Sequence, residues 1–360
     1  MTQQTILSLT ANILPSIKSM GISEAVHNQW KKACLGVISQ NLNIQHEEKR
    51  LIELLSNNNI PFVVIKGSSA AVYYCHPEYR TAGDIDIFVR PQSIEQVRIL
   101  LDKEKYELIE DFTEDLRHIT YIHRNTTIEI HQRFFTIDDG ETVKEDVDLY
   151  EALEKRAIKP FRDYSVPVFL EVDNGLLLLQ HMRQHLRSGM GLRQLIDWAM
   201  YVNTICDDHF WNNGFRDAVE SAGLYNLALC STHLIKKYLW VNEKITWCNE
   251  ADDSLCEDLL EYIISKGNFG HKRSEQSDKV AVVLSHNMNL KEWLCYLQKQ
   301  GCEHWRFAQK HKGFKGIAWL YQLFRYLALG VKEICTSSIG RQYKMSKNRK
   351  NMFDKLNIPV

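Results

Sequence analysis

Residues 62–89 read FVVIKGSSAAVYYCHPEYRTAGDIDIFV, a pattern that predicts a strand, a short helical run and a second strand. In the second strand Asp84 and Asp86 alternate with apolar residues, so both carboxylates lie on one face. Two neighbouring carboxylates repel each other unless a cation lies between them, and oxygen ligands select Mg²⁺ or Mn²⁺ over Zn²⁺. The segment therefore predicts a divalent-cation site on a strand.

The turn between the first strand and the helical run carries Gly67 and Ser68. Glycine lets a phosphate approach the backbone closely, and a serine at a helix start offers an amide and a hydroxyl group. The alternative interpretation of this pair is an ordinary helix N-terminus. Next to the cation site, however, the pair favours binding of a nucleotide phosphate.

A third acid lies in a later β-type run. Glu129 is flanked by Ile128 and Ile130, and we expect its strand to pair beside the aspartate strand. Three acids on adjacent strands suit a two-metal phosphoryl-transfer site. His131 follows two residues later on the same face, where it could orient a carboxylate or the acceptor.

The pattern along the chain predicts an α+β fold with a small mixed β-sheet between an N-terminal helical segment and a larger C-terminal helical domain. A helix over 93–103 with a cap at Ser93 is expected to pack on the sheet, and a short turn joins strands at 119–122 and 127–130. The predicted units are a helical segment over 1–58, an α+β domain over 59–170, a helical domain over 171–335 and a basic tail over 336–360.

Composition indicates an ordinary globular protein of 360 residues with 44% hydrophobic content. The chain has no run of eighteen apolar residues and no secretory signal at its start, which predicts a cytoplasmic protein without a transmembrane segment. Its nine cysteines include no Cys-x-x-Cys pair, so reduced thiols are expected. The basic tail suits contact with nucleic acid, an anionic membrane surface or a polyanionic substrate, or else it is a solvated terminus.

The order Gly67-Ser68, Asp84-x-Asp86 and a later strand acid at Glu129 resembles the DNA polymerase β-like nucleotidyltransferase superfamily. The wider stretch looks like a bacterial family of uncharacterised nucleotidyltransferases, some of them encoded in polysaccharide-synthesis loci. The resemblance implies that Asp84 and Asp86 bind the metals, that Glu129 is a third ligand able to help activate the acceptor, and that Gly67 and Ser68 hold the triphosphate. The spacer between Ser68 and Asp84 is longer than is commonest in the superfamily.

Two basic residues close to this segment, Lys66 and Arg80, could balance phosphate charge. The alternatives are an exposed position for Arg80 and an exposed or fold-stabilising position for Lys66.

The predicted helical domain contributes a second group of polar residues, which in the family faces the cleft. His181 and His185 lie four residues apart on a predicted helix, and no third ligand is evident, so structural or substrate-facing histidines are favoured over a zinc site. Arg193 and Asp197 could line the nucleotide or acceptor pocket, or could form a salt bridge on the helix surface.

Together these features predict a Mg²⁺-dependent or Mn²⁺-dependent enzyme that transfers an NMP group from an NTP to an unidentified acceptor hydroxyl or phosphate. The resemblance implies polysaccharide-related metabolism as one context in which the enzyme could act. One alternative is a toxin-like nucleotidyltransferase that modifies tRNA or protein. Another is a catalytically silent nucleotide-binding scaffold, against which the presence of all three carboxylates argues.

Overall fold

The computed structural model describes residues 21, 23–77, 80–111, 118–135, 142–239 and 241–266, and further short pieces at 294–295, 297–298, 301–302, 305, 316–325 and 349–358. The chain divides into two compact units, of which the first comprises Met1–Leu186 and Gly191–Cys256 and the second comprises Arg187–Met190 and Glu257–Val360. The predicted boundary near residue 170 falls inside the first unit and stays a prediction. Most of the basic tail, predicted over 336–360, lies outside the described residues.

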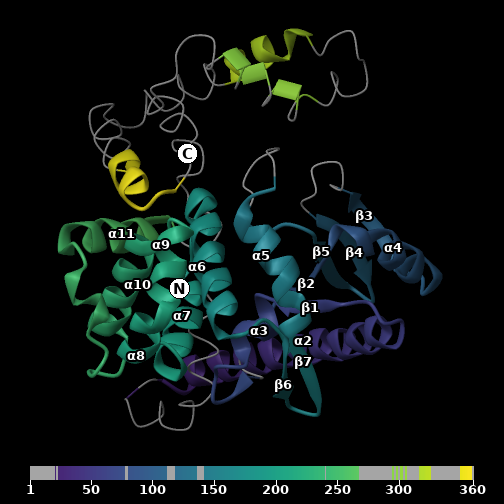
Figure 1. Ribbon diagram of the computed structural model, residues 1–360, viewed down its shortest axis with the longest axis horizontal. Coiled ribbons are helices and arrows are strands. Elements are labelled where there is room, and N and C mark those ends of the chain that lie inside the picture. Colours follow the sequence, from purple (N-terminus) through teal and green to yellow (C-terminus); the bar gives the residue numbers. More distant parts are fainter. Residues whose placement is uncertain are drawn as a thin grey trace. The chain divides into compact units, whose positions relative to one another are not determined.

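A five-stranded mixed sheet forms the centre of the first unit (Figure 1). Its strands are β1 (Phe62–Ile65), β2 (Asp84–Val89), β3 (Glu107–Asp111), β4 (His118–His123) and β5 (Thr126–His131). Their order in the sheet is β1-β2-β5-β4-β3. Strands β2 and β5 are parallel, and the other neighbours are antiparallel. The predicted α+β fold with a small mixed sheet is confirmed.

One face of the sheet is apolar because the alternating residues of β2 and β5 point into a core. This core contains Ile85 and Ile87 of β2 and Ile128 and Ile130 of β5, all at most 2% exposed. Side chains from helices α2 (Glu24–Asn57) and α4 (Ile94–Lys103) complete it. The polar side chains of β2 and β5 therefore lie on the opposite face.

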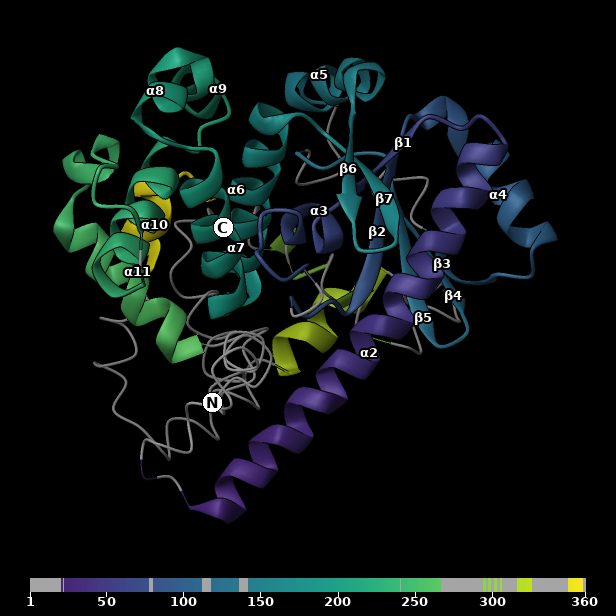
Figure 2. The ribbon, with the colours of Figure 1, turned by 90° about the horizontal axis from the view of Figure 1, so that it is seen from below.

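Helix α2 is 34 residues long and lies against β2, β5 and a later strand, β7 (Tyr164–Val168) (Figure 2). Ser23 caps its start, where its side chain accepts a hydrogen bond from the Val26 amide. The helix ends as predicted at Asn57–Asn59, and Asn59 adopts a positive φ of 54°.

The next helices are short. Helix α3 (Gly67–Ala71) follows β1 directly, with Lys66 at its N-cap position. A 3₁₀ turn η3 (Pro91–Ser93) precedes α4, and the predicted cap at Ser93 is wrong. The turn already places Ser93 in a helical conformation, so its side chain makes no capping hydrogen bond.

A second, two-stranded sheet consists of β6 (Ala157–Phe161) and β7 (Tyr164–Val168), and β7 lies against β1. It follows α5 (Lys144–Ala152) and the turn η5 (Leu153–Lys155).

The next helices of the first unit gather beside the sheet in Figure 1. They are α6 (Glu171–Ser188), α7 (Leu192–Thr204), α8 (Asp208–Phe210), η6 (Trp211–Phe215), α9 (Arg216–Ser221), α10 (Tyr225–Tyr238) and η7 (Trp247–Glu250). Helix α11 (Asp253–Lys266) follows and extends into the second unit. A kink at Asn213 and Gly214 lies within η6, where Gly214 takes a φ of 100°. Among the described residues, no helix is long and apolar enough to cross a membrane.

Candidate active site

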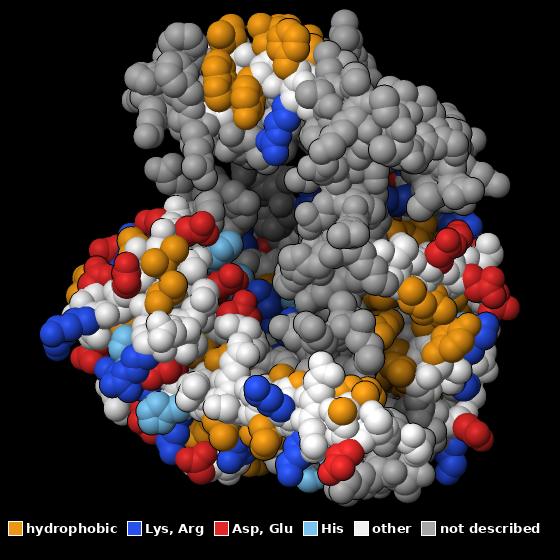
Figure 3. Space-filling model, turned by 180° about the vertical axis from the view of Figure 1, so that it is seen from behind, with side chains coloured by type: hydrophobic (Ala, Val, Ile, Leu, Met, Phe, Trp, Pro, Cys, Tyr) orange, Lys and Arg blue, Asp and Glu red, His pale blue; other side chains and the backbone are white. Residues whose placement is uncertain are grey.

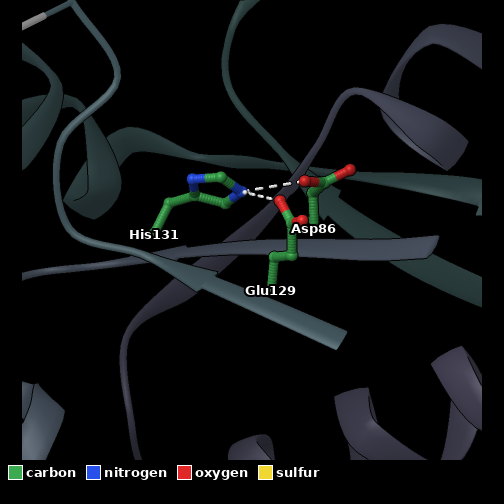
Figure 4. Close-up of side chains that lie close together, drawn as sticks. All are labelled: Asp86, Glu129 and His131. Carbon is green, nitrogen blue, oxygen red and sulfur yellow. Dashed lines mark hydrogen bonds and ion pairs between the residues drawn. The ribbon is translucent and has the colours of Figure 1, made fainter. Parts of the chain in front are cut away.

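The parallel pairing of β2 with β5 sets Asp86 opposite Glu129. His131 lies two residues further along β5, so its side chain shares their face. Its Nε2 atom lies 2.8 Å from Asp86 Oδ1 and 3.2 Å from Glu129 Oε2 (Figure 4). One ligand atom from each residue lies within 4.8 Å of the others. The predicted pairing of the Glu129 strand beside the aspartate strand is confirmed.

This Asp86–Glu129–His131 cluster could hold a metal ion. Its two carboxylates are donors that suit Mg²⁺ or Mn²⁺, and an imidazole nitrogen is a common ligand of transition metals. The donor set therefore fits the divalent cation that the sequence predicts. Asp84, the first residue of β2, is not a member of the cluster.

A lysine ammonium group lies among these side chains. Lys66 Nζ is 2.6 Å from Asp86 Oδ1 and 3.7 Å from Glu129 Oε2, and 3.3 Å from His131 Nε2. Burial lowers the pKa of Lys66, but the charges of Asp86, Glu129 and Asp84 raise it by more, so Lys66 stays protonated. The fold-stabilising pairing considered for Lys66 is thus present.

The charges in this cluster shift one another's pKa values. Burial raises the pKa of Asp86, but Lys66 and His131 lower it by more, so the pKa lies well below its ordinary value. The pKa of Asp84 is raised to about 6, first by the charge of Asp86 and then by burial. The fold thus keeps Asp86 ionised and makes Asp84 the more basic of the two aspartates.

Gly67 and Ser68 begin α3 immediately after Lys66. The Ser68 hydroxyl donates a hydrogen bond of 2.5 Å to Glu48 Oε2, so it points to α2. The Tyr164 hydroxyl donates to the same oxygen at 2.7 Å. Burial raises the pKa of Glu48, although these two hydrogen bonds lower it.

Glu48 is a member of the site that the sequence reasoning missed. It lies at a helical spacing from the buried residues Ile44, Leu51 and Leu55, so it occupies the apolar face of α2. Acidic residues are rarely buried unless they have a partner, so an acid on the apolar face of a helix could have marked Glu48 as a candidate functional residue.

Arg80 is buried and forms a two-pronged ion pair with Asp197 of α7. Its Nε donates to Asp197 Oδ1 at 3.0 Å, and its Nη2 donates to Oδ2 at 2.7 Å. The Tyr74 hydroxyl also donates to Asp197, at 2.7 Å. Asp197 is 2% exposed, so the exposed salt bridge considered between Arg193 and Asp197 is wrong, and so is an exposed position for Arg80.

Arg193, four residues before Asp197, is left with weaker contacts. Its Nη1 donates to the Thr81 carbonyl at 3.4 Å, and its Nε is buried without a hydrogen-bond partner among the described residues. Burial and the charge of Arg80 lower its pKa.

His181 and His185 contact each other on α6, with 2.8 Å between their Nε2 atoms. Burial lowers the pKa of His185 to about 4, and burial and His185 lower that of His181. The charges of Lys66 and Asp86 also act on both rings, so this pair lies near the Asp86–Glu129–His131 cluster. In Figure 3, acidic, basic and histidine side chains lie side by side in the middle of the face shown.

The sequence and the fold of this chain are each similar to known proteins. The sequence model of a family described as uncharacterised nucleotidyltransferases matches residues 2–239. No curated protein matches the chain. Among solved structures, the antibiotic-resistance factor ANT(2'')-Ia is similar with 9% identity and a TM-score of 0.37, over 55% of this chain and 99% of that one. An antigenic nucleotidyltransferase-like protein from Paracoccidioides brasiliensis is similar with 11% identity and a TM-score of 0.29, over 51% and 88%.

Proposed function

Because the chain belongs to the family of uncharacterised nucleotidyltransferases, we propose that it uses a divalent cation to transfer an NMP group from an NTP to an acceptor hydroxyl or phosphate. The observation that carries this proposal is the convergence of Asp86, Glu129 and His131 on the polar face of the sheet. Asp84 lies beside this cluster, on the same face of β2 as Asp86.

In the proposed reaction an oxygen of the acceptor attacks the α-phosphorus of the NTP, the bond to the β-phosphate breaks, and pyrophosphate leaves. Asp86, Glu129 and His131 would hold the cation, with Asp84 as a further carboxylate. When bound, the cation supplies neutralisation of the charge that develops on the phosphates. Glu129 would also help activate the acceptor.

The remaining roles are assigned by position. Gly67 and Ser68 would hold the triphosphate through backbone amides, because the Ser68 hydroxyl is engaged by Glu48. Arg193 is a better candidate than Arg80 for binding phosphate, because Asp197 holds the Arg80 guanidinium group on two sides. His181 and His185 would line the acceptor side of the pocket.

Two measurements test the proposal. The first is whether NTP and metal stabilise the protein against thermal unfolding, and the second is whether the protein releases pyrophosphate from NTP. Thermal unfolding is measured with each NTP, with and without Mg²⁺ or Mn²⁺, for the wild type, Asp86→Asn and Glu129→Gln. We expect NTP and metal together to stabilise the wild type more than either does alone, and both variants to lose this combined effect and pyrophosphate release. Asp102→Asn, an exposed position on α4, is the matched control. If NTP with metal does not stabilise the wild type, the proposal fails and the silent scaffold is favoured.

A further inference from the structure

The ammonium group of Lys66 lies against the carboxylates of β2 and β5 that the proposed cation would bind. It is 2.6 Å from Asp86 Oδ1 and 3.7 Å from Glu129 Oε2. The side chains of Lys66 and Asp86 are only 16% and 1% exposed, so little water screens this contact. Lys66 is thus a buried counter-ion of the cluster.

A divalent cation at the Asp86–Glu129–His131 cluster would bind the same two carboxylates. Mg²⁺ binds carboxylate oxygens at about 2.1 Å, and a lysine 2.6 Å from the same oxygen would be in direct repulsion with it. Repulsion between like charges is stronger in a buried site than in water. The ammonium group and the metal are therefore alternative occupants of this position.

The backbone of Lys66 also has an unusual conformation. Its φ of 55° and ψ of −115° lie in a region that favours glycine, and such a conformation is strained for any other residue. Strain of this kind persists where the surrounding structure and the side chain hold it. Here the side chain reaches Asp86, and the Lys66 carbonyl accepts hydrogen bonds from Ala70 N and Ser69 Oγ.

We propose that Lys66 is a built-in counter-cation that competes with the divalent metal for Asp86 and Glu129. This inference rests on the proposed function, because it concerns the same metal site. Metal binding must displace the ammonium group, so the fold sets the metal concentration at which the site fills. In the absence of metal, the same group neutralises the carboxylates of Asp86, which is buried, and Glu129, which is partly exposed.

The first test compares Lys66→Met with Lys105→Met by titration with Mn²⁺ alone, with free Mn²⁺ followed by electron paramagnetic resonance. Lys105 is the matched control, because it is an exposed lysine that also has a positive φ, of 63°. We expect Lys66→Met to bind Mn²⁺ at least tenfold more tightly than the wild type, and Lys105→Met to bind within twofold of it. An unchanged or weaker affinity in Lys66→Met would overturn the proposal.

The second test uses the wild type, in case Lys66→Met does not fold. The rate at which an amine-reactive acetylating reagent modifies Lys66 is measured by peptide mass spectrometry with and without Mn²⁺. Displacement from Asp86 should expose the amine, so Mn²⁺ is expected to raise the modification rate of Lys66 several-fold and leave that of Lys105 unchanged. If Mn²⁺ binds and the Lys66 rate is unchanged or lower, Lys66 does not compete with the metal.

Asp86→Asn separates the two proposals. If neither the wild type nor Lys66→Met binds Mn²⁺, or if binding survives in Asp86→Asn, the proposed metal site fails, and the competition fails with it. If the wild type binds Mn²⁺ in an Asp86-dependent way and Lys66→Met binds it equally well, only the competition fails.

Discussion

The carboxyl group of Asp84 holds its proton more tightly than an ordinary aspartate does, because the charge of Asp86 and burial raise its pKa to about 6. Between about pH 4 and pH 6, the folded chain therefore binds a proton that the unfolded chain has released. The free energy of unfolding falls as the pH rises through this range, and the loss is complete above the folded-state pKa.

Asp84→Asn removes this titration. We expect the metal-free variant to be more stable than the wild type by about 3 kcal/mol at pH 7.5 and nearly equal to it at pH 3.5. Urea unfolding in the presence of a chelator at both pH values measures the difference. Asp102→Asn on the exposed face of α4 is the control substitution, and an equal gain at both pH values for Asp84→Asn would contradict the explanation.

Gly67 has room for a methyl group. A Cβ atom there would lie 3.8 Å from the Asp84 carbonyl oxygen and 4.0 Å from Arg80 Nη1, which are ordinary contacts. Gly67→Ala should therefore change the free energy of unfolding by less than about 1 kcal/mol. Its stabilisation by NTP and Mn²⁺ should fall at least severalfold, because the methyl group would obstruct a phosphate at the backbone. Gly36→Ala on α2, also without a close neighbour, is the control and should keep the full nucleotide effect.

The sequence predicted the polar face of the sheet well at the level of single residues. Strand alternation alone places Asp86, Glu129 and His131 on one face, and the structure has them there. It could not predict the partners of Lys66, Ser68 or Arg80, which come from other elements. Local pattern carries no information on such contacts.

Among the elements, α6 carries the histidine pair that the structure keeps neutral. Burial lowers the pKa of His185 to about 4, so the unfolded chain takes up a proton here as the pH falls below about 6.5, while the folded chain does not. The stability that this histidine contributes is complete above about pH 6.5 and is lost as the pH falls toward 4. This pH dependence is opposite to that of a histidine whose pKa is raised by a partner, because such a histidine stabilises the folded state at low pH.

His185→Gln should make the protein less sensitive to acid. We expect the loss of unfolding free energy between pH 7 and pH 4.5 to shrink by about 2 kcal/mol relative to the wild type. Urea unfolding at several pH values measures it, and His209→Gln, at an exposed position of α8, is the control. If both variants lose stability in acid as the wild type does, His185 is not held neutral by the fold.

Elements with a clear apolar pattern were predicted correctly, and those without one were missed. The strands at 62–65, 85–89, 119–122 and 127–130 are present in the sheet. Strand β3 was missed because it is an exposed edge strand with three acids, and β6 because Pro160 and Lys159 obscure its pattern. The strand conformation of β3 and of β6 depends more on pairing with the adjacent strand than on the β-propensity of their own residues.

For the molecule as a whole, the ion pair between Arg80 and Asp197 joins the segment before β2 to helix α7. Helix α2 holds the same segment, because Asn41 donates to the Arg80 carbonyl and accepts from the Ala82 amide. Three distant parts of the first unit thus meet at one short segment. No feature of the sequence indicated this, because a contact between residues 80 and 197 leaves no local pattern.

Asp197→Ala leaves the buried guanidinium group of Arg80 without its partner. We expect it to lower the free energy of unfolding by about 3–5 kcal/mol, as measured by urea unfolding. Glu220→Ala, which breaks the exposed pair with Arg216, should cost less than about 1 kcal/mol. The double variant Arg80→Met/Asp197→Leu should recover part of the loss. If Asp197→Ala and Glu220→Ala lower the free energy of unfolding equally, the buried ion pair contributes no more to stability than the exposed one.

The parallel pairing of β2 with β5 also has a consequence for the kinetics of folding. The two strands are separated in the chain by α4, β3 and β4, so Asp86 and Glu129 come together only after a long loop has closed. A cation that needs both carboxylates can bind only once this pairing exists. If the pairing forms after the main folding barrier, Mn²⁺ will slow unfolding and leave the refolding rate almost unchanged. Stopped-flow refolding and unfolding with and without Mn²⁺ would show at which side of the barrier the metal site is assembled.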